Sequence, residues 1–428
     1  MKLKESEARN EIRRTYIKLD RRTPCMIYEP LHPEEKSKIA VICMHSDDSY
    51  FEFAPTYGLA QRGYRVITSS YPNPGIPLDE KILQVKKVFE YIREYPGVEK
   101  VLLLGHSGGA TLMTTYQMTA ENGCEAFQGP EKNLPMEDLG ELPKADGLML
   151  LDANFGNGVM TLLSLDPAII EEGNGMKRDP SLDMFNPENG YGETGCHFSD
   201  EFIHRFWKGQ AERMNRLIDY AKDKLKPENK GNLEFDGDEP LLIAGGTQYK
   251  PMNKIFPQMP DRFFSGTEGE WPLLHKDRSI TVGKVPCLRA FFPGAQTSGD
   301  YRTGCLITTL QTFLRSSSVR VDPEKFGYDQ HNLYGIDWDS SYCCTTGNAA
   351  YISSPMLIMG MTGSYEYIAS ELIYKRAVKC SDKTLAFVEG ASHNFEAEHE
   401  IEKVPGQYGD TAGLTFDYVD EWIRARYI

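Results

Sequence analysis

The stretch from residue 101 to residue 110, Val-Leu-Leu-Leu-Gly-His-Ser-Gly-Gly-Ala, restricts the fold of this chain more than any other segment. An apolar run typical of a buried strand ends at Gly105, a helical pattern begins after Gly109, and Ser107 stands between them. A serine on such a sharp strand-to-helix turn takes unfavourable backbone angles, so its neighbours must be small. The turn holds the hydroxyl clear of the sheet and directs the next amide at any anion beside it. We therefore predict a nucleophile elbow at Ser107; the alternative is a glycine-rich turn with a capping serine.

Strands and helices alternate on both sides of this turn. Three further apolar runs are typical of buried strands: Lys38–Met44, Tyr64–Ser70 and Gly147–Leu151. Apolar residues at helical spacing connect them, over Phe53–Arg62, Leu78–Tyr95 and about Thr111–Asn122. This order predicts the α/β class, with a mostly parallel, doubly wound sheet and helices on both faces. In such sheets the chemistry lies at the carboxyl ends of the strands.

A long irregular segment interrupts the alternation. From about 153 to 353 the chain is rich in Gly, Pro, Asn and Asp, and one strong helix is predicted there, from roughly Asp200 to Leu225. Strands and helices return from Pro355 to the closing helix Leu414–Tyr427. The simplest organisation is one core built from residues 1–152 and 354–428. Residues 153–353 are then a mainly helical and irregular insertion that forms a cap over the carboxyl ends of the strands.

Composition excludes several classes of function. The chain has 428 residues with 47 basic and 62 acidic side chains, a net charge of −15, and no Lys/Arg-rich run. We therefore expect no nucleic-acid partner. The charged N-terminus lacks the apolar region of a signal peptide, and no uncharged apolar stretch has the length of a membrane span. These features predict a cytoplasmic protein without a membrane partner, and they leave a homo-oligomer open.

Nine cysteines occur at irregular spacing, without a Cys-x-x-Cys pair. An odd, irregular set predicts free thiols rather than a disulfide framework or a zinc site. For the adjacent pair Cys343-Cys344 we expect two ordinary half-buried thiols, the alternatives being a vicinal disulfide or a thiol that faces substrate. No histidine pair has metal-ligand spacing on a helix, and no glycine fingerprint for a nucleotide is present. We predict neither a metal nor an organic cofactor.

Three segments carry a resemblance to a known family. They are Gly-His-Ser-Gly-Gly at 105–109, Met-His-Ser-Asp at 44–47, and Glu-Gly-Ala-Ser-His at 389–393. Over roughly residues 20–152 and 354–428 the chain resembles the α/β-hydrolase superfamily, here with a large inserted cap. The resemblance implies a nucleophile at Ser107 and a base at His393, in a loop after the final strand and before the closing helix. It also implies a carboxylate that orients the imidazole and stabilises its charged form.

The position of that carboxylate departs from the family's pattern. After the strand that begins at Pro355 the family usually has Gly-x-x-Asp, whereas this chain reads Gly-Met-Thr-Gly-Ser-Tyr-Glu. Glu366 is the nearest carboxylate in that loop. Asp152, after the strand 148–151, is a second candidate, because some family members supply the acid from there. Glu371, on the following helix, is a third.

An oxyanion intermediate needs two backbone N–H donors beside the serine. One is the amide of Gly108. The resemblance implies that the other comes from the turn after the first strong strand, hence from Ser46 or Asp47. Asp47 and Asp48 also bring negative charge near a site that must stabilise an anion. Capping of the next helix is the simplest explanation, and hydrogen bonds to substrate hydroxyls or a preference for a cationic group are alternatives. The two neighbouring histidines, His45 and His106, are predicted to contact substrate.

These residues predict a serine hydrolase that cleaves a carboxylic ester through an acyl-enzyme. Because the insertion is rich in aromatic residues, we expect a mid-sized, apolar or aromatic small molecule as substrate. Hydrolysis of a carbon–carbon bond, an amide or a thioester is an alternative, since the fold is shared by all of these reactions. A third hypothesis is a binding protein that kept the fold with an incomplete triad, which the irregular acid position favours.

Overall fold

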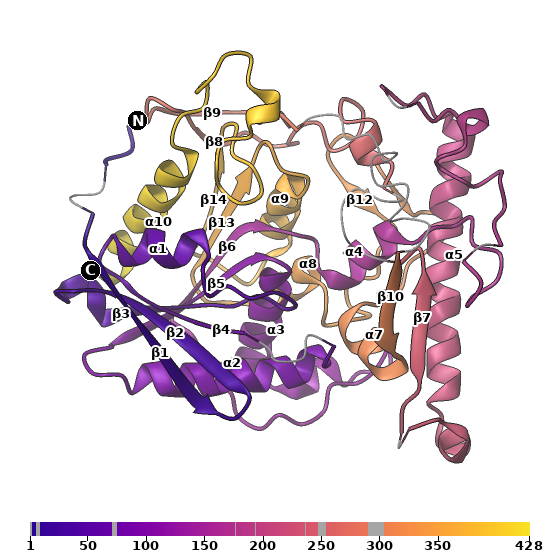
Figure 1. The fold of residues 1–428 in the computed structure, drawn as a ribbon, viewed down its shortest axis with the longest axis horizontal. Helices are drawn as coiled ribbons and strands as arrows, with labels where there is room; N and C mark the ends of the chain where they lie inside the picture. Colours follow the sequence, from indigo (N-terminus) through magenta and orange to yellow (C-terminus); the bar gives the residue numbers. More distant parts are fainter. Residues whose placement is uncertain are drawn as a thin grey trace.

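The computed structural model describes residues 2–5, 9–70, 75–175, 177–192, 194–235, 237–246, 254–289 and 304–428. Its centre is a ten-stranded sheet with the order β1-β2-β4-β3-β5-β6-β13-β14-β8-β9 (Figure 1). The pairs β1–β2, β2–β4 and β8–β9 are antiparallel, and all other pairs are parallel. This arrangement confirms the predicted α/β-hydrolase fold with a mostly parallel sheet. The strands are β1 (Ile12–Asp20), β2 (Thr23–Pro30), β3 (Ile39–Cys43), β4 (Arg65–Ser69), β5 (Lys100–Ser107), β6 (Gly147–Ala153), β8 (Trp271–Leu274), β9 (Ile280–Gly283), β13 (Met356–Met361) and β14 (Lys383–Val388).

Helices cover both faces of the sheet. Ala40 and Ile42 of β3 belong to a hydrophobic core that α2, α3 and α9 complete, whereas Val41 and Cys43 belong to a second core with α1 and α10. Burial on both faces explains why the central strands are continuous apolar runs. The helices are α1 (Ala54–Ala60), α2 (Leu78–Arg93), α3 (Gly108–Asn122), α9 (Tyr367–Arg376) and α10 (Thr411–Tyr427). In the described ranges, no helix combines the length and the apolar character needed to cross a membrane.

Most of the insertion lies at one end of the molecule. Its long helix α5 (Asp200–Lys224) and the antiparallel pair β7–β10 lie at the right of Figure 1, away from the β1–β2 hairpin. The Ser199 hydroxyl accepts a 3.1 Å hydrogen bond from the Phe202 amide and so caps α5 where the sequence predicts its start. The other elements here are α4 (Asn157–Ser164), β7 (Pro240–Ala244), β10 (Cys305–Thr309), α7 (Leu310–Ser316), β11 (Gly327–Tyr328), β12 (Leu333–Tyr334) and α8 (Thr345–Ala349). Short 3₁₀ helices span Glu35–Lys38, Cys124–Phe127, Pro187–Asn189, Pro227–Asn232, Phe256–Gln258 and His399–Ile401.

Two strands within the insertion belong to the central sheet. β8 pairs with β14 in parallel, with Leu273 opposite Phe387, and β9 continues the edge. Residues 271–283 therefore extend the core, unlike the predicted cap of 153–353; the rest of that division stays a prediction. Each of these strands has four residues, too few for an alternating pattern to separate them from a loop. The β1–β2 hairpin was likewise not predicted.

All nine cysteines are free thiols, as predicted. Cys343 and Cys344 are fully buried rather than half-buried. The Cys343 thiol donates to the carbonyl oxygen of Ser318 at 3.3 Å and lies 2.9 Å from the Ser341 hydroxyl. The pair is therefore neither a vicinal disulfide nor a thiol open to substrate.

Candidate active site

Ser107 stands at the junction of β5 and α3, in a backbone conformation that L-residues rarely adopt. Its φ is 52° and its ψ is −128°. A Cβ on Gly105 would lie 2.6 Å from the Cα of Ala110, and a Cβ on Gly109 would lie 2.5 Å from the carbonyl oxygen of Met44. Neither glycine has room for a side chain. The local geometry is that of a strained strand-to-helix turn, and α3 begins at once after the serine, three residues earlier than the sequence predicts.

A second strained residue lies at the end of the next strand. The register between β5 and β6 shifts after His106, so that Ser107 pairs beyond Asp152, which has a φ of 46°. The Asp152 side chain is fully buried, and its Oδ1 accepts a 2.9 Å hydrogen bond from the Met361 amide. Among the described residues, five non-glycine residues have positive φ, and Ser107, Asp152 and Phe395 are three of them. Strain concentrated in this way indicates a functional site.

His393 lies in the loop after β14, and its ring faces two carboxylates. Nδ1 of His393 is 2.6 Å from Oδ2 of Asp152 and 3.6 Å from Oε2 of Glu366. The first contact is a hydrogen bond, whereas the second is too long for one. The Glu366 oxygen instead accepts a 3.2 Å bond from the Ser364 hydroxyl. Of the carboxylates that the sequence leaves open, Asp152 is therefore the one in position to orient the imidazole.

Glu371 has a different role, and its candidacy as the acid is wrong. It is fully buried on α9. Its carboxylate accepts hydrogen bonds from the amides of Glu268 and Gly269, at 2.9 and 2.7 Å, and from the Trp271 indole at 2.9 Å. These donors belong to the start of β8 and the segment before it. The hydrogen bonds of Glu371 therefore link α9 to the edge of the sheet.

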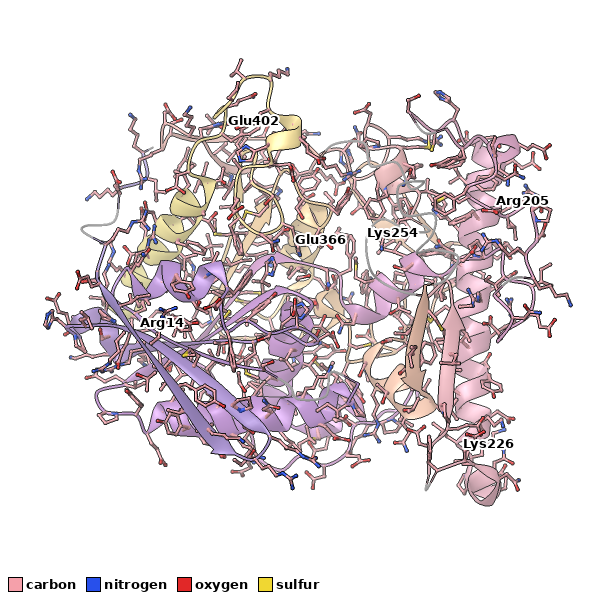
Figure 2. All side chains as sticks on the ribbon, viewed as in Figure 1. Arg14, Arg205, Lys226, Lys254, Glu366 and Glu402 are labelled. Atoms are coloured by element: carbon pink, nitrogen blue, oxygen red, sulfur yellow. The ribbon has the colours of Figure 1, made fainter. Side chains whose placement is uncertain are left out.

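The two carboxylates near His393 change its titration. Burial favours the neutral ring, but the charge of Glu366 and the hydrogen bond to Asp152 outweigh it and raise the pKa of His393 to about 9. Desolvation raises the pKa of Asp152, against the effect of its bond to His393. Lys254 is buried, and desolvation lowers its pKa to about 8 while the charge of Glu366 opposes that change. Figure 2 shows Glu366 and Lys254 in the same part of the molecule. Glu366 thus acts on His393 through charge rather than through orientation.

Both ring nitrogens of His106 are hydrogen-bonded within the protein. Its Nε2 is 2.7 Å from the carbonyl oxygen of His393, and its Nδ1 is 2.7 Å from the Tyr50 hydroxyl. Because a carbonyl oxygen only accepts, Nε2 carries the proton and Nδ1 accepts from Tyr50. Burial holds the pKa of His106 well below its ordinary value. With both nitrogens hydrogen-bonded, this ring links the His393 loop to the elbow; it also lines the cavity described below, and its contact with substrate stays a prediction.

The ring of His45 closes the turn after β3. Its Nδ1 accepts hydrogen bonds of 3.0 Å from the amides of both Asp47 and Asp48. The Asp47 amide is thus occupied within its own turn, which argues against the prediction that it is an oxyanion donor. Ser46 is fully buried, and its Oγ lies 2.7 Å from the position that a Cβ would take on Gly108. The turn and the elbow are therefore in direct contact.

The carboxylate of Asp47 is balanced by a buried cation. Its Oδ1 accepts from Nζ of Lys81 on α2 at 2.8 Å, and its Oδ2 accepts from the Ser46 hydroxyl at 2.5 Å. Desolvation opposes ionisation, but the Lys81 charge outweighs it and lowers the pKa of Asp47. Asn157 completes the group by donating to Ser46 Oγ at 3.2 Å. The sequence analysis missed Lys81 and Asn157, because a lysine in an amphipathic helix and an asparagine in an irregular segment carry no signal for this role.

A cavity of about 870 Å³ opens over these residues. Ser107, Gly108, His45 and His393 line it from the core, and residues of the insertion line it from the other side. The other described lining residues are acidic, polar, aromatic or apolar: Asp47, Asp48, Glu52, Glu396, Ser49, Asn154, Asn157, Ser316, Ser317, Asn394, His106, Tyr50, Phe53, Ala54, Cys305 and Leu306. The serine and the histidine therefore share one compartment that is large enough for a small organic molecule.

One cluster has the spacing of a metal site. Ligand atoms of Asp152, Glu366 and His393 lie within 4.8 Å of one another. A cation would use the same His393 Nδ1 that is hydrogen-bonded to Asp152. Because a metal ligand must first lose the proton on that nitrogen, the cluster is better explained as a base with its acid partner.

Neither the protein-family models nor the curated proteins include a match to this sequence. Among solved structures, Est1E from Butyrivibrio proteoclasticus is similar over 96% of this chain and 98% of its own, at 12% identity and a TM-score of 0.40. A hormone-sensitive lipase from a metagenome library is similar over 99% and 88%, at 12% identity and a TM-score of 0.43. The esterase domain of a Rhodothermus marinus protein is similar over 97% and 98%, at 9% identity and a TM-score of 0.40. These likenesses are too distant to transfer an activity.

Proposed function

We propose that this protein is a serine hydrolase that cleaves carboxylic esters through an acyl-enzyme on Ser107. In this proposal His393 is the general base and Asp152 the carboxylate that orients it. One observation carries the proposal: a serine with a φ of 52° shares a cavity with a histidine whose Nδ1 is 2.6 Å from a fully buried aspartate. The strained backbone at Ser107 and Asp152, and the burial of the Asp152 carboxylate against His393, are costly for stability, which supports a catalytic use.

The proposed reaction has two halves. Nε2 of His393 takes the proton of the Ser107 hydroxyl as its Oγ attacks the ester carbonyl carbon. The tetrahedral intermediate then expels the alcohol, which receives that proton, and the acyl group stays on Oγ. A water molecule, deprotonated by the same nitrogen, releases the acid and restores the serine. Throughout, Asp152 accepts from Nδ1–H and stabilises the imidazolium.

The substrate that we propose is an uncharged, mid-sized ester. A volume of about 870 Å³ suits a molecule of that size. Carboxylates of Asp48, Glu52 and Glu396 in the described lining disfavour an anionic substrate by like-charge repulsion. Tyr50 and Phe53 stack at a centroid distance of 4.0 Å and offer an aromatic wall for an apolar acyl or alcohol group. Because the lining includes acidic side chains as well as an aromatic wall, we expect a substrate that carries polar groups beside an apolar part, rather than a purely apolar one.

A panel of substrates tests this function. Purified protein is assayed with neutral aryl esters, anionic aryl esters, anilides, aryl thioesters and vinylogous diketones, with the Ser107→Ala variant as the blank. We expect serine-dependent turnover to be fastest with neutral esters. Faster turnover of anilides, thioesters or diketones would contradict ester specificity while leaving the serine mechanism intact. A preference for anionic esters would contradict the proposed substrate class.

We expect kcat/KM for ester hydrolysis to rise with pH until about pH 9. Below that pH the ring of His393 is protonated and cannot accept the serine proton, so the rate follows its raised pKa. Glu366→Gln removes one of the two charges that raise the pKa and should move the rising limb to lower pH. Profiles of kcat/KM against pH check this expectation. Glu125→Gln, at an exposed position outside the described cavity lining, is the control. A rising limb that stays in place in Glu366→Gln would contradict the electrostatic role of that carboxylate.

A further inference from the structure

The hydrogen bonds of His45 fix which of its ring nitrogens carries a proton. Nδ1 accepts from two backbone amides, those of Asp47 and Asp48, at 3.0 Å each. A ring nitrogen that accepts an N–H has no proton of its own, so the proton of the neutral ring is on Nε2. Desolvation lowers the pKa of His45 to about 4, against the charges of the two aspartates. Around neutral pH the ring is therefore a neutral, oriented N–H donor.

That donor is directed at the elbow. Nε2 of His45 lies 3.1 Å from the position that a Cβ would take on Gly108, the residue directly after the serine. His45 also lines the cavity together with Ser107, Gly108 and His393. The carbonyl oxygen of a substrate under attack by Ser107 must lie beside the Gly108 amide, because that amide follows the nucleophile at the start of α3. The Nε2–H group thus borders the space in which negative charge develops.

The same turn removes a backbone donor from that space. The Asp47 amide, one of the two that the sequence leaves open as an oxyanion donor beside that of Ser46, is bound to Nδ1 of His45. The Asp47 carboxylate is also held by Lys81, at 2.8 Å, and by the Ser46 hydroxyl, so that its charge is compensated. The His45 ring therefore occupies the Asp47 amide with Nδ1 and offers its own Nε2–H group as a donor instead.

We propose that the Nε2–H group of His45 is an oxyanion-hole donor that acts together with the Gly108 amide. This assignment rests on the proposed ester hydrolysis and gives His45 a specific catalytic role in it. A neutral donor that is held in place by two backbone hydrogen bonds needs no reorganisation when the intermediate forms. A side-chain donor of this kind stabilises the transition state more than the bound ester, so it acts on kcat rather than on KM.

Two substitutions at His45 separate this role from closure of the turn. In His45→Asn, the side-chain oxygen can replace Nδ1 as acceptor for the two amides, but no donor reaches the place of Nε2. In His45→Gln, the amide nitrogen can reach the place of Nε2, but the cap on the turn is lost. A donor role predicts that the Gln variant is the more active of the two. A purely structural role predicts the reverse order.

The variants are assayed with a neutral aryl ester and with an aryl trifluoromethyl ketone, which forms a tetrahedral adduct on an active serine. We expect His45→Asn to lower kcat by about 100- to 1000-fold with KM changed little, and to weaken the inhibitor by a similar factor. We expect His45→Gln to recover part of both losses. Thermal melting of both variants reports whether the fold is kept, and if one variant does not fold, the inhibitor affinity of the other decides.

Wild-type turnover and inhibitor affinity in His45→Asn would overturn the assignment, and so would an Asn variant that is more active than the Gln variant. Failure of this inference is distinguishable from failure of the proposed function. In the first case Ser107 still reacts with the inhibitor and the wild-type protein still hydrolyses the ester. In the second case the wild-type protein does neither.

Discussion

Replacing Ser107 with alanine is expected to lower kcat for ester hydrolysis by about 10⁵-fold, because the substitution removes the hydroxyl that we propose forms the acyl-enzyme. The substitution removes one oxygen and keeps the Cβ, so the strained turn at φ 52° is retained. Residual hydrolysis then reflects binding and the oxyanion donors alone. Steady-state rates with a neutral aryl ester, at enzyme concentrations high enough to detect the residual activity, measure the loss.

Ser49 offers a matched control for this substitution. It lines the same cavity on the turn after β3, and Ser49→Ala should keep kcat within a few-fold of the wild-type value, in the range of ordinary surface changes. If Ser107→Ala retains more than about one per cent of the activity, a different nucleophile carries the reaction. Loss of activity in both variants would indicate damage to the cavity rather than loss of the nucleophile.

Asp152→Asn is expected to lower kcat by about 10⁴-fold with little change in the fold. The asparagine amide can still hydrogen-bond to Nδ1 of His393, but it donates where the carboxylate accepts. It therefore favours the tautomer with the proton on Nε2, which cannot take the serine proton. Oδ1 of Asp152 also accepts from the Met361 amide at 2.9 Å, and the asparagine oxygen can keep that bond.

The loss of kcat in Glu366→Gln is compared with that in Asp152→Asn to decide which carboxylate orients His393. Its Oε2 is 3.6 Å from Nδ1 of His393, against 2.6 Å for Oδ2 of Asp152. We expect a loss of about tenfold or less at the optimal pH, the size of one pKa unit of electrostatic effect. Rates of both variants, each at its own optimal pH, decide between the carboxylates. A larger loss in Glu366→Gln than in Asp152→Asn would assign the acid to the loop after β13 instead.

The sequence predicts those elements whose signals are local. Helix α5 is predicted within one residue because Ser199 caps it, acidic residues fill its first turn and an amphipathic pattern fills its length. The strands of the core are predicted because burial on both faces makes them continuous apolar runs. The start of α3 is predicted too late, because two glycines in a row resemble a loop unless the elbow geometry is known.

Which carboxylate orients His393 cannot be predicted from local sequence signals. Asp152 lies at the end of β6 and Glu366 in the loop after the neighbouring strand β13, and both lie within 4 Å of His393 Nδ1. They differ by 1 Å in their distance from Nδ1, at 2.6 and 3.6 Å. Strand order brings both candidates to the same edge of the sheet, but a difference of this size depends on side-chain and loop geometry that no sequence pattern marks.

The two histidines predicted to bind substrate illustrate the same limit. His45 and His106 each follow or end a buried strand of the core, and both are neutral at ordinary pH. In His106 the Nε2–H group is bound to the carbonyl oxygen of His393, whereas Nε2 of His45 lies 3.1 Å from the position that a Cβ would take on Gly108. The tautomer and the direction of an imidazole depend on tertiary hydrogen bonds, which residue type and spacing do not encode.

Labelling with a fluorophosphonate shows whether Ser107 is an activated nucleophile, because this reagent reacts with an activated serine and needs no knowledge of the substrate. The protein is labelled under native conditions, digested, and mapped by peptide mass. With Ser107 as nucleophile and His393 as base, we expect one label per chain, located on Ser107. The label should be absent in Ser107→Ala, and labelling should be strongly slowed in His393→Ala. A native protein that shows no label on Ser107, or labels equally well in His393→Ala, would contradict the proposed nucleophile and base.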